Sequence, residues 1–113
     1  MYNDELFSRT RALLGGDAMQ KLRDAHVCVF GVGGVGGYVA EMLARCGVGC
    51  ITLFDSDRVS LTNRNRQIIA LDSTTGMLKT SAMAERLRDI NPQIQVFEQP
   101  VFYTPENADS YPL

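Results

Sequence analysis

A chain of 113 residues is long enough for one small domain. It is 45% hydrophobic and 21% charged, with a net charge of -2 and a mean hydropathy near zero, as in ordinary soluble globular proteins. No apolar run approaches the roughly 20 residues that a membrane span needs, and residues 1–5 are acidic and polar, unlike a secretory signal. The net charge indicates no general basic surface for nucleic acid, and it leaves room for a local basic patch.

The simplest location for such a protein is the cytoplasm. Its three cysteines, Cys28, Cys46 and Cys50, are odd in number and their spacing fits neither a disulfide framework nor a CxxC zinc pair. We interpret them as small buried hydrophobic residues or inert thiols.

The first elements in chain order are two short helices and a strand. Residues 5–14 predict a helix that Gly15 and Gly16 end. Asp17 is the expected N-cap of the next helix, with Gln20 as its capping-box partner. Residues 26–30, HVCVF, form a compact β-branched apolar run, which predicts a strand buried on both faces.

A glycine-rich turn and a second strand–helix unit follow. Residues 31–37 contain five glycines, and a helix then runs to Gly47, with Val39, Met42, Leu43 and Cys46 at helical spacing. Residues 50–54, CITLF, predict a second buried strand. A polar stretch through Asn65 and a short apolar segment at residues 68–71 lie between this strand and the third predicted helix.

The third helix is expected to start from a cap at Ser73, Thr74 or Thr75 and to run to about Ile90, where Asn91-Pro92 stops it. Its core face would carry Met83, Leu87 and Ile90. Residues 94–98 predict a third strand, and residues 103–107 a turn. Alternating strands and helices predict an α/β fold, a Rossmann-like parallel sheet with flanking helices that forms the first, nucleotide-binding half of a doubly wound fold.

The glycine turn satisfies GxGxxG through Gly31, Gly33, Gly34 and Gly36, after a strand and before a helix. Glycines let the backbone approach a phosphate closely, and the helix N-terminus presents unpaired N–H groups. Asp55 ends the next strand, 19 residues after Gly36, where a carboxylate can accept hydrogen bonds from ribose hydroxyls. These features fit NAD, FAD or ATP.

Three further features favour ATP. A second acid, Asp57, follows Asp55, two arginines, Arg64 and Arg66, follow the second strand, and Lys79 lies near the start of the next helix. A triphosphate carries more charge than a dinucleotide's diphosphate and favours fixed cations. From spacing alone, these cations are equally consistent with a solvated surface.

The order of motifs in this sequence resembles that of the ThiF-like superfamily, which activates ubiquitin-like and sulfur-carrier proteins by adenylation. The motifs are, in chain order, GxGGxG, GVG, a hydrophobic strand, DxD, NxxRQ and a lysine after a TG pair. The resemblance covers the chain from about Phe7 to its end. Within the superfamily, the sequence is most similar to the bacterial tRNA threonylcarbamoyladenosine dehydratases. The segments that carry this resemblance are FSRTRALLG, RQIIAL, RLRDINP and FYTPENAD. Those enzymes use ATP to activate the threonine carboxylate of a modified tRNA adenosine, and ring closure to a cyclic ester follows.

The resemblance implies a role for each candidate residue. The loop glycines shape the ATP site and Asp55 holds the ribose. Asn63, Arg66 and Lys79 contact the phosphates, while Asp57 supports the site. Arg9 is expected to reach from one subunit of a homodimer into the ATP site of its partner. Arg64 and Gln67 take structural or tRNA-facing roles.

The family's fold extends well beyond residue 113, and the resemblance places a magnesium-binding aspartate, the second half of the sheet, and the dimer and tRNA surfaces there. Residues 1–25 are therefore expected to form a helical arm, and residues 26–113 the Rossmann-like half, of a single adenylating domain that is inactive without the remainder. The first strand would lie at an open edge. A sulfur-carrier adenylyltransferase, an NAD-dependent oxidoreductase and a non-catalytic nucleotide-binding module are the alternatives.

Overall fold

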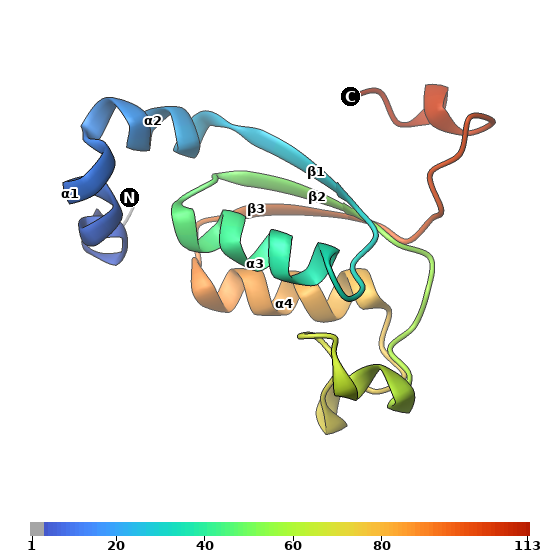
Figure 1. The fold of residues 1–113 in the computed structure, drawn as a ribbon. Coiled ribbons are helices and arrows are strands. Elements are labelled where there is room, and N and C mark those ends of the chain that lie inside the picture. Colours follow the sequence, from blue (N-terminus) through green and yellow to red (C-terminus); the bar gives the residue numbers. More distant parts are fainter. Residues whose placement is uncertain (1–3) are drawn as a thin grey trace.

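The computed structural model describes residues 4–113. Three parallel strands, β1 (His26–Phe30), β2 (Cys50–Phe54) and β3 (Gln95–Gln99), form one sheet in the order β1-β2-β3. Helices α3 (Gly36–Cys46) and α4 (Lys79–Ile90) make the two crossovers, and both lie on the same side of the sheet (Figure 1). This arrangement confirms the predicted Rossmann-like α/β fold, with β1 at one edge of the sheet.

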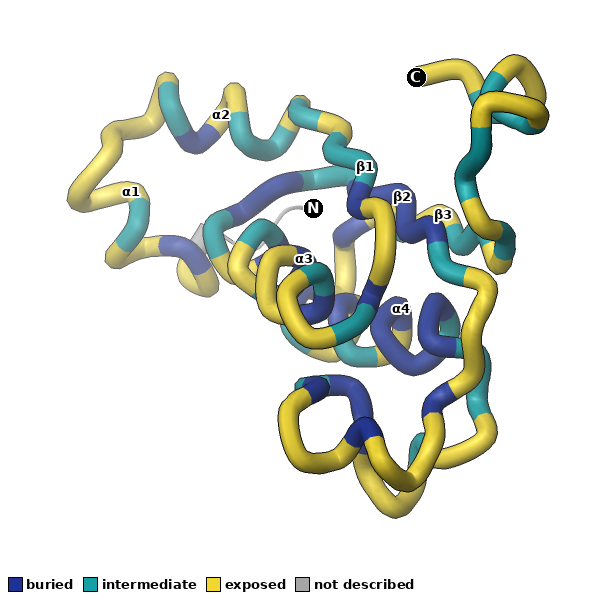
Figure 2. Tube along the Cα trace, turned by 45° about the vertical axis from the view of Figure 1, so that its right-hand side comes forward, coloured by how far each residue is buried: buried dark blue, intermediate teal, exposed yellow. Residues whose placement is uncertain are grey.

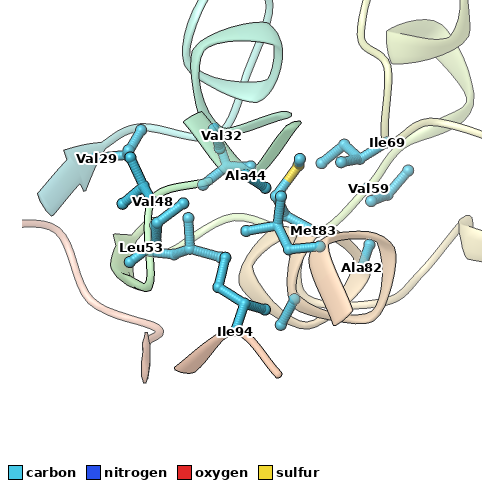
Figure 3. Close-up of a cluster of buried hydrophobic side chains, with 14 of the residues drawn as sticks. Val29, Val32, Ala44, Val48, Leu53, Val59, Ile69, Ala82, Met83 and Ile94 are labelled. Atoms are coloured by element: carbon cyan, nitrogen blue, oxygen red, sulfur yellow. The ribbon is translucent and has the colours of Figure 1, made fainter. Parts of the chain in front are cut away.

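The core lies between the sheet and these two helices. Ile51 and Leu53 from β2 meet Met83 and Leu87 from α4, and all four side chains are fully buried. Figure 3 shows this cluster, which also includes Val29, Val32, Ala44 and Val48. Small residues on the inner side of α3 let that helix approach the sheet closely.

Among residues 4–113, the opposite face of the sheet is covered by the C-terminal segment. Tyr103 and Tyr111 from that segment pack edge-on against Phe54, with ring centroids 5.4 and 5.6 Å away. Phe97 and Phe30 on the same face stay about half exposed. The sheet is therefore covered fully on one side and partly on the other (Figure 2).

An N-terminal arm precedes the sheet. It consists of the 3-10 turn η1 (Asp4–Phe7) and the helices α1 (Ser8–Leu14) and α2 (Gly16–Asp24). Phe7 and Met19 are buried beside Gly47, at the C-terminal end of α3. The arm is thereby fixed at the end of α3 that lies away from the glycine loop (Figure 1). None of the helices within residues 4–113 is long and apolar enough to cross a membrane.

The predicted bounds of β1 and β2 are confirmed, and so is the end of α3 at Gly47, which has a φ of 102°. Two capping predictions are wrong. The N-cap of α2 is Gly15, and Asp17 lies inside the first turn. Helix α4 begins only at Lys79, because Thr74 and Thr75 fold back on Leu71 in a separate turn, η3 (Asp72–Thr74).

One prediction of burial is also wrong. Strand β1 is not buried on both faces, because it is an edge strand whose second face has little cover, and His26 and Phe30 are exposed. On α3, Val39 and Met42 point to solvent, while Gly37, Ala40 and Ala44 face the core.

Candidate functional site

The glycine loop lies where β1 ends and α3 begins. The Gly31 N–H donates to the Phe54 carbonyl at 2.7 Å, which ties the loop to β2, and Gly31 has a φ of 90° that favours glycine. A side chain at Gly36 would overlap the Gly31 carbonyl group. The tight turn therefore needs glycine at Gly31 and Gly36, and it leaves the α3 N-terminus facing the space above the loop.

Asp55 connects this loop to the next segment. Its Oδ2 accepts a hydrogen bond from the Val32 N–H at 2.7 Å, and its Oδ1 accepts one from the Asp57 N–H at 2.8 Å. Each carboxylate oxygen has two acceptor sites, so each keeps one for a ribose hydroxyl. Asp55 is half-buried, which leaves it accessible to a ligand.

Asp57 continues the connection to α4. Its carbonyl accepts a hydrogen bond from the Lys79 N–H at 3.0 Å, while its own side chain is exposed. The residues after β2 and the residues before α4 also pair, through a bridge between Arg58 and Leu78. Three hydrogen bonds thus link the glycine loop, the end of β2 and the first residue of α4.

Lys79 is the most unusual side chain in this region. It is 7% exposed, and no carboxylate among residues 4–113 lies within ion-pair distance of its ammonium group. It is also the first residue of α4, where the helix dipole already contributes positive charge. A cation at a helix N-terminus without a carboxylate partner is electrostatically disfavoured until an anion binds, so the site favours a negatively charged ligand.

The segment η2 (Leu61–Asn65) holds the other predicted phosphate contacts. Asn63 is buried, and its Oδ1 accepts a hydrogen bond from the Ser60 N–H at 2.9 Å, which fixes the amide. Arg66 is exposed, bonds only to Asn65 and Thr62, and has no carboxylate partner within the described residues. Its guanidinium is therefore available to an anion.

Arg64 differs from Arg66. Its guanidinium donates to Asp72 at 3.0 Å and to Thr75 at 3.0 Å, so it joins η2 to η3. Of the two roles expected for Arg64, structural or tRNA-facing, these contacts favour the structural one.

Gln67 lies directly against the glycine loop. Its side chain is 7% exposed, its Oε1 is buried without a hydrogen-bond partner, and its Nε2 would lie 3.6 Å from a Cβ atom at Gly33. An unsatisfied buried amide costs free energy, and in native structures such groups commonly serve a function. The sequence predicts a structural or tRNA-facing role for Gln67, and nothing in its motif beyond its position after Arg66 indicates a place against the loop.

A cavity of about 360 Å³ opens beside Asp55. Phe30, Phe54 and Tyr103 form its aromatic walls, with ring centroids of Phe30 and Tyr103 4.8 Å apart. An apolar cavity of this size, with carboxylates at its mouth, suits a nucleoside. The wall residues Val101, Phe102 and Tyr103 were absent from the predicted site, because their segment carries no recognisable motif. Two larger cavities lie away from the glycine loop, and neither is lined by it.

Arg9 does not lie in this site. It is exposed on α1, and its arm packs at Gly47, beyond the C-terminal end of α3. The 11 residues of α3 separate that end from the glycine loop by about 16 Å at 1.5 Å per residue. The structure therefore does not bring Arg9 to the glycine loop of its own chain.

The chemistry of the remaining groups is limited. Residues 4–113 contain no group of three or more His, Cys, Asp or Glu side chains that could hold a metal ion. Cys28, Cys46 and Cys50 are free and half-buried, and burial raises the pKa of the Cys50 thiol, which keeps it protonated and unreactive.

Comparison with known proteins gives consistent matches. The model of the ThiF family matches residues 7–111. The tRNA threonylcarbamoyladenosine dehydratase of Escherichia coli is 50% identical over 105 residues, which is 93% of this chain and 39% of the relative. The Bacillus subtilis enzyme of the same name is 46% identical over 93% of this chain and 41% of its own length. The chain thus spans about two fifths of the length of these curated relatives.

A relative with another name and a solved structure are also similar to this chain. The ubiquitin-like modifier-activating enzyme 5 of Drosophila ananassae is 47% identical over 68% of this chain and 19% of its own length. The crystal structure of the Escherichia coli dehydratase in complex with ATP superposes with a TM-score of 0.93 at 50% identity, over 95% of this chain and 44% of that one.

Proposed function

Because the chain belongs to the ThiF family, we propose that it supplies the ATP-binding part of an enzyme that adenylates a carboxylate. One observation carries this proposal: Lys79 is buried without a counter-ion and is linked through Asp57 and Asp55 to the glycine loop. A related crystal structure that contains ATP supports the choice of nucleotide. A dinucleotide offers no comparable reason for a buried cation at this place.

In the proposed reaction a carboxylate oxygen attacks the α-phosphorus of ATP. The bond from that phosphorus to the α,β-bridging oxygen breaks, and diphosphate leaves with the electron pair. Gly31, Gly33, Gly34 and Gly36 let the triphosphate approach the backbone, and Asp55 accepts hydrogen bonds from the ribose. The cations stabilise the charge that develops on the leaving diphosphate.

Three side chains would contact the phosphates. Lys79 acts as a fixed buried point charge, and Arg66 swings its exposed guanidinium onto them. The Asn63 amide is held by Ser60 through its oxygen, which leaves its N–H₂ group to donate.

The substrate we propose is the threonine carboxylate of tRNA threonylcarbamoyladenosine. After adenylation, the carbamoyl oxygen of the same group would attack the activated carbonyl carbon, an adjacent N–H would lose its proton and AMP would leave, which closes the cyclic ester. The relatives with that name support this choice, because they match over 84% to 93% of the chain, whereas the modifier-activating enzymes match over about 70%. The second candidate is the C-terminus of a ubiquitin-like sulfur-carrier protein, which the 47% identity to a modifier-activating enzyme favours.

The wider setting follows from the same proposal. Residues 1–25 act as an arm and residues 26–113 as the first half of one adenylating domain, in a cytoplasmic homodimer that uses ATP. Magnesium would accompany the ATP and neutralise phosphate charge when bound. The exposed Asp57 carboxylate is a single ligand and does not make a magnesium site by itself, so the main protein ligand would come from outside residues 1–113.

Calorimetric titration of the complete gene product with ATP and with NAD tests the proposal. We expect ATP to bind far more tightly, and Lys79→Met to weaken ATP binding about tenfold or more, as expected for a lost charged contact. Lys21→Met, at an exposed lysine on α2, is the matched control and should bind ATP normally. Tighter binding of NAD, or unchanged ATP binding in Lys79→Met, would refute adenylation at this site.

The substrate is decided by a second assay. ATP–diphosphate exchange should be stimulated by tRNA that carries threonylcarbamoyladenosine and not by a carrier protein ending in Gly-Gly. Stimulation by the carrier protein alone would select the second candidate.

A further inference from the structure

Gln67 joins two segments that are far apart in the sequence. It follows η2, in the excursion that the chain makes between β2 and α4 (Figure 1), and its side chain reaches back to the glycine loop. There its Nε2 atom lies 3.6 Å from the position that a Cβ atom of Gly33 would take. The side chain is 7% exposed, so packing holds it in this place and it does not move freely in solvent.

The side-chain amide of Gln67 forms no hydrogen bond with any of residues 4–113, although an amide can both donate and accept. Its Oε1 is buried and unpaired, and its Nε2 is the end that lies against Gly33. The reverse orientation of the amide would bury an N–H₂ group with two unpaired donors. Unpaired buried N–H groups are rarer in proteins than unpaired carbonyl oxygens, so the amide presents donors to the loop.

The backbone of Gln67 is fixed as well. Its N–H donates to the Asn63 carbonyl at 2.9 Å, and its own carbonyl accepts a hydrogen bond from the Ala70 N–H at 3.0 Å. Gln67 therefore belongs to the same turn as Asn63 and Arg66, which are proposed to contact the phosphates. A side chain that is already held in place loses little conformational freedom when it binds a ligand.

The part of the loop beside Gln67 also offers unpaired donors. The Val32 N–H donates to Asp55, but the N–H groups of Gly33 and Gly34 have no acceptor among residues 4–113. Both glycines directly precede the N-terminal end of α3, which carries a partial positive charge. Donors from the backbone and from the Gln67 amide thus occur side by side, and an anion bound at the loop would satisfy both.

We propose that Gln67 is a further phosphate-binding residue, which donates a hydrogen bond from Nε2 to a phosphate oxygen of ATP bound beside Gly33 and Gly34. This role rests on the proposed function, because a nucleotide must bind at the loop. Gln67 carries no charge, so its task differs from that of Lys79. The lysine neutralises phosphate charge, whereas the fixed amide sets where the phosphate lies on the loop.

A packing role for Gln67 has a different consequence. Methionine is similar to glutamine in length and volume, and it would fill the same space without leaving a polar atom unpaired. Gln67→Met should therefore keep or raise Tm in the absence of nucleotide. If the side chain served packing alone, this variant would also bind ATP like the parent, so ATP affinity and Tm together separate the two roles.

Calorimetric titration of the complete gene product with ATP and with adenosine tests the proposal. Adenosine has no phosphate, so Gln67→Met should bind it like the parent while binding ATP about tenfold more weakly, as for a lost hydrogen bond to a charged group. Gln67→Glu has nearly the same shape but replaces the donors with a negative charge, so it should weaken ATP binding at least as much. Gln93→Met is the matched control and should bind both ligands normally, because Gln93 is exposed and precedes β3 at the end of the sheet away from the loop.

Unchanged ATP affinity in Gln67→Met would overturn the proposal. An equal loss of affinity for ATP and adenosine, or a loss of ATP affinity together with a lower Tm, would also overturn it, because the amide would then support the structure of the pocket. Lys79→Met keeps these results distinct from a failure of the proposed function. If Lys79→Met weakens ATP binding and Gln67→Met does not, the nucleotide site stands and only the role of Gln67 is wrong, whereas a parent protein that binds no ATP would refute both.

Discussion

Replacing Gly36 with alanine should distort the glycine loop, because the added methyl group would overlap the carbonyl oxygen and carbon of Gly31. Both are backbone atoms, so the overlap can be relieved only by moving the loop and not by rotating a side chain. Gly34→Ala is the matched control. A methyl group at Gly34 meets no atom within 4 Å, and Gly34 has no positive φ that would disfavour a side chain.

The size of the effect follows from the kind of contact. Overpacking typically destabilises a protein by about 1–3 kcal/mol, and in a protein of the relatives' length each 1 kcal/mol lowers Tm by about 2–4 °C. We therefore expect Gly36→Ala to lower Tm by a few degrees or more. Gly34→Ala should stay within about 0.5 kcal/mol of the parent, as surface substitutions usually do.

Differential scanning fluorimetry and ATP titration measure both consequences in the complete gene product. A displaced loop also loses backbone N–H contacts to phosphate, so Gly36→Ala should weaken ATP binding about tenfold or more. The loop geometry described here would be wrong if Gly36→Ala unfolded at the parent Tm, or if Gly34→Ala were as unstable as Gly36→Ala.

Three further predictions concern other parts of the molecule. Asp55→Ala should weaken ATP binding by about 1–3 kcal/mol in calorimetry, and unchanged affinity would move the ribose contact elsewhere. Hydrogen bonding to Arg86 lowers the pKa of Glu41 below 4.5, so the pair stabilises the fold above that pH, and the contribution is lost as pH falls through the lowered pKa. The Tm difference between the parent and Glu41→Gln should therefore be present at pH 7 and shrink progressively as the pH falls below 4.5, and a difference that stays constant with pH would contradict this. Arg9→Ala mixed with Lys79→Met should recover activity through hybrid dimers, because one of the two sites is then complete, and no recovery would exclude Arg9 from the site of its partner.

Local patterns were sufficient to predict the sheet and the loop. HVCVF and CITLF mark β1 and β2 because strands in a parallel sheet carry continuous apolar runs, and Gly47 marks the end of α3 because only glycine favours its φ of 102°. The prediction failed where two local signals competed. Thr74 and Thr75 are good caps, but they satisfy the turn at Leu71, and α4 starts from Leu78 without a side-chain cap.

The site was predicted only where its residues belong to motifs. Asp55 and Lys79 stand at fixed places after β2 and at the start of α4, so their convergence follows from the parallel topology. The cavity walls at Val101, Phe102 and Tyr103 come from a segment whose path depends on tertiary packing against Phe54. Gln67 was missed as a loop contact for the same reason, since its burial under Gly33 depends on how η2 folds back.

The arrangement of charge explains why the loop alone is not enough for a triphosphate. The Val32 N–H is already bonded to Asp55, so one donor of the glycine loop serves to order the site and is not available to phosphate. In the proposed function the further positive charge would come from the segment between β2 and α4, where the Lys79 N–H donates to the Asp57 carbonyl and holds the start of α4.

Lys79 carries its charge at the positive N-terminal end of α4 without a carboxylate partner among residues 4–113, and this costs electrostatic free energy in the protein without nucleotide. That cost is smallest when the side chain is apolar, so Lys79→Met should keep or raise Tm in the absence of nucleotide while it weakens ATP binding. Opposite effects on stability and binding are the mark of a residue retained for its ligand. A Lys79→Met variant that lost both Tm and ATP affinity would instead show that the ammonium group stabilises the fold through a contact within the protein.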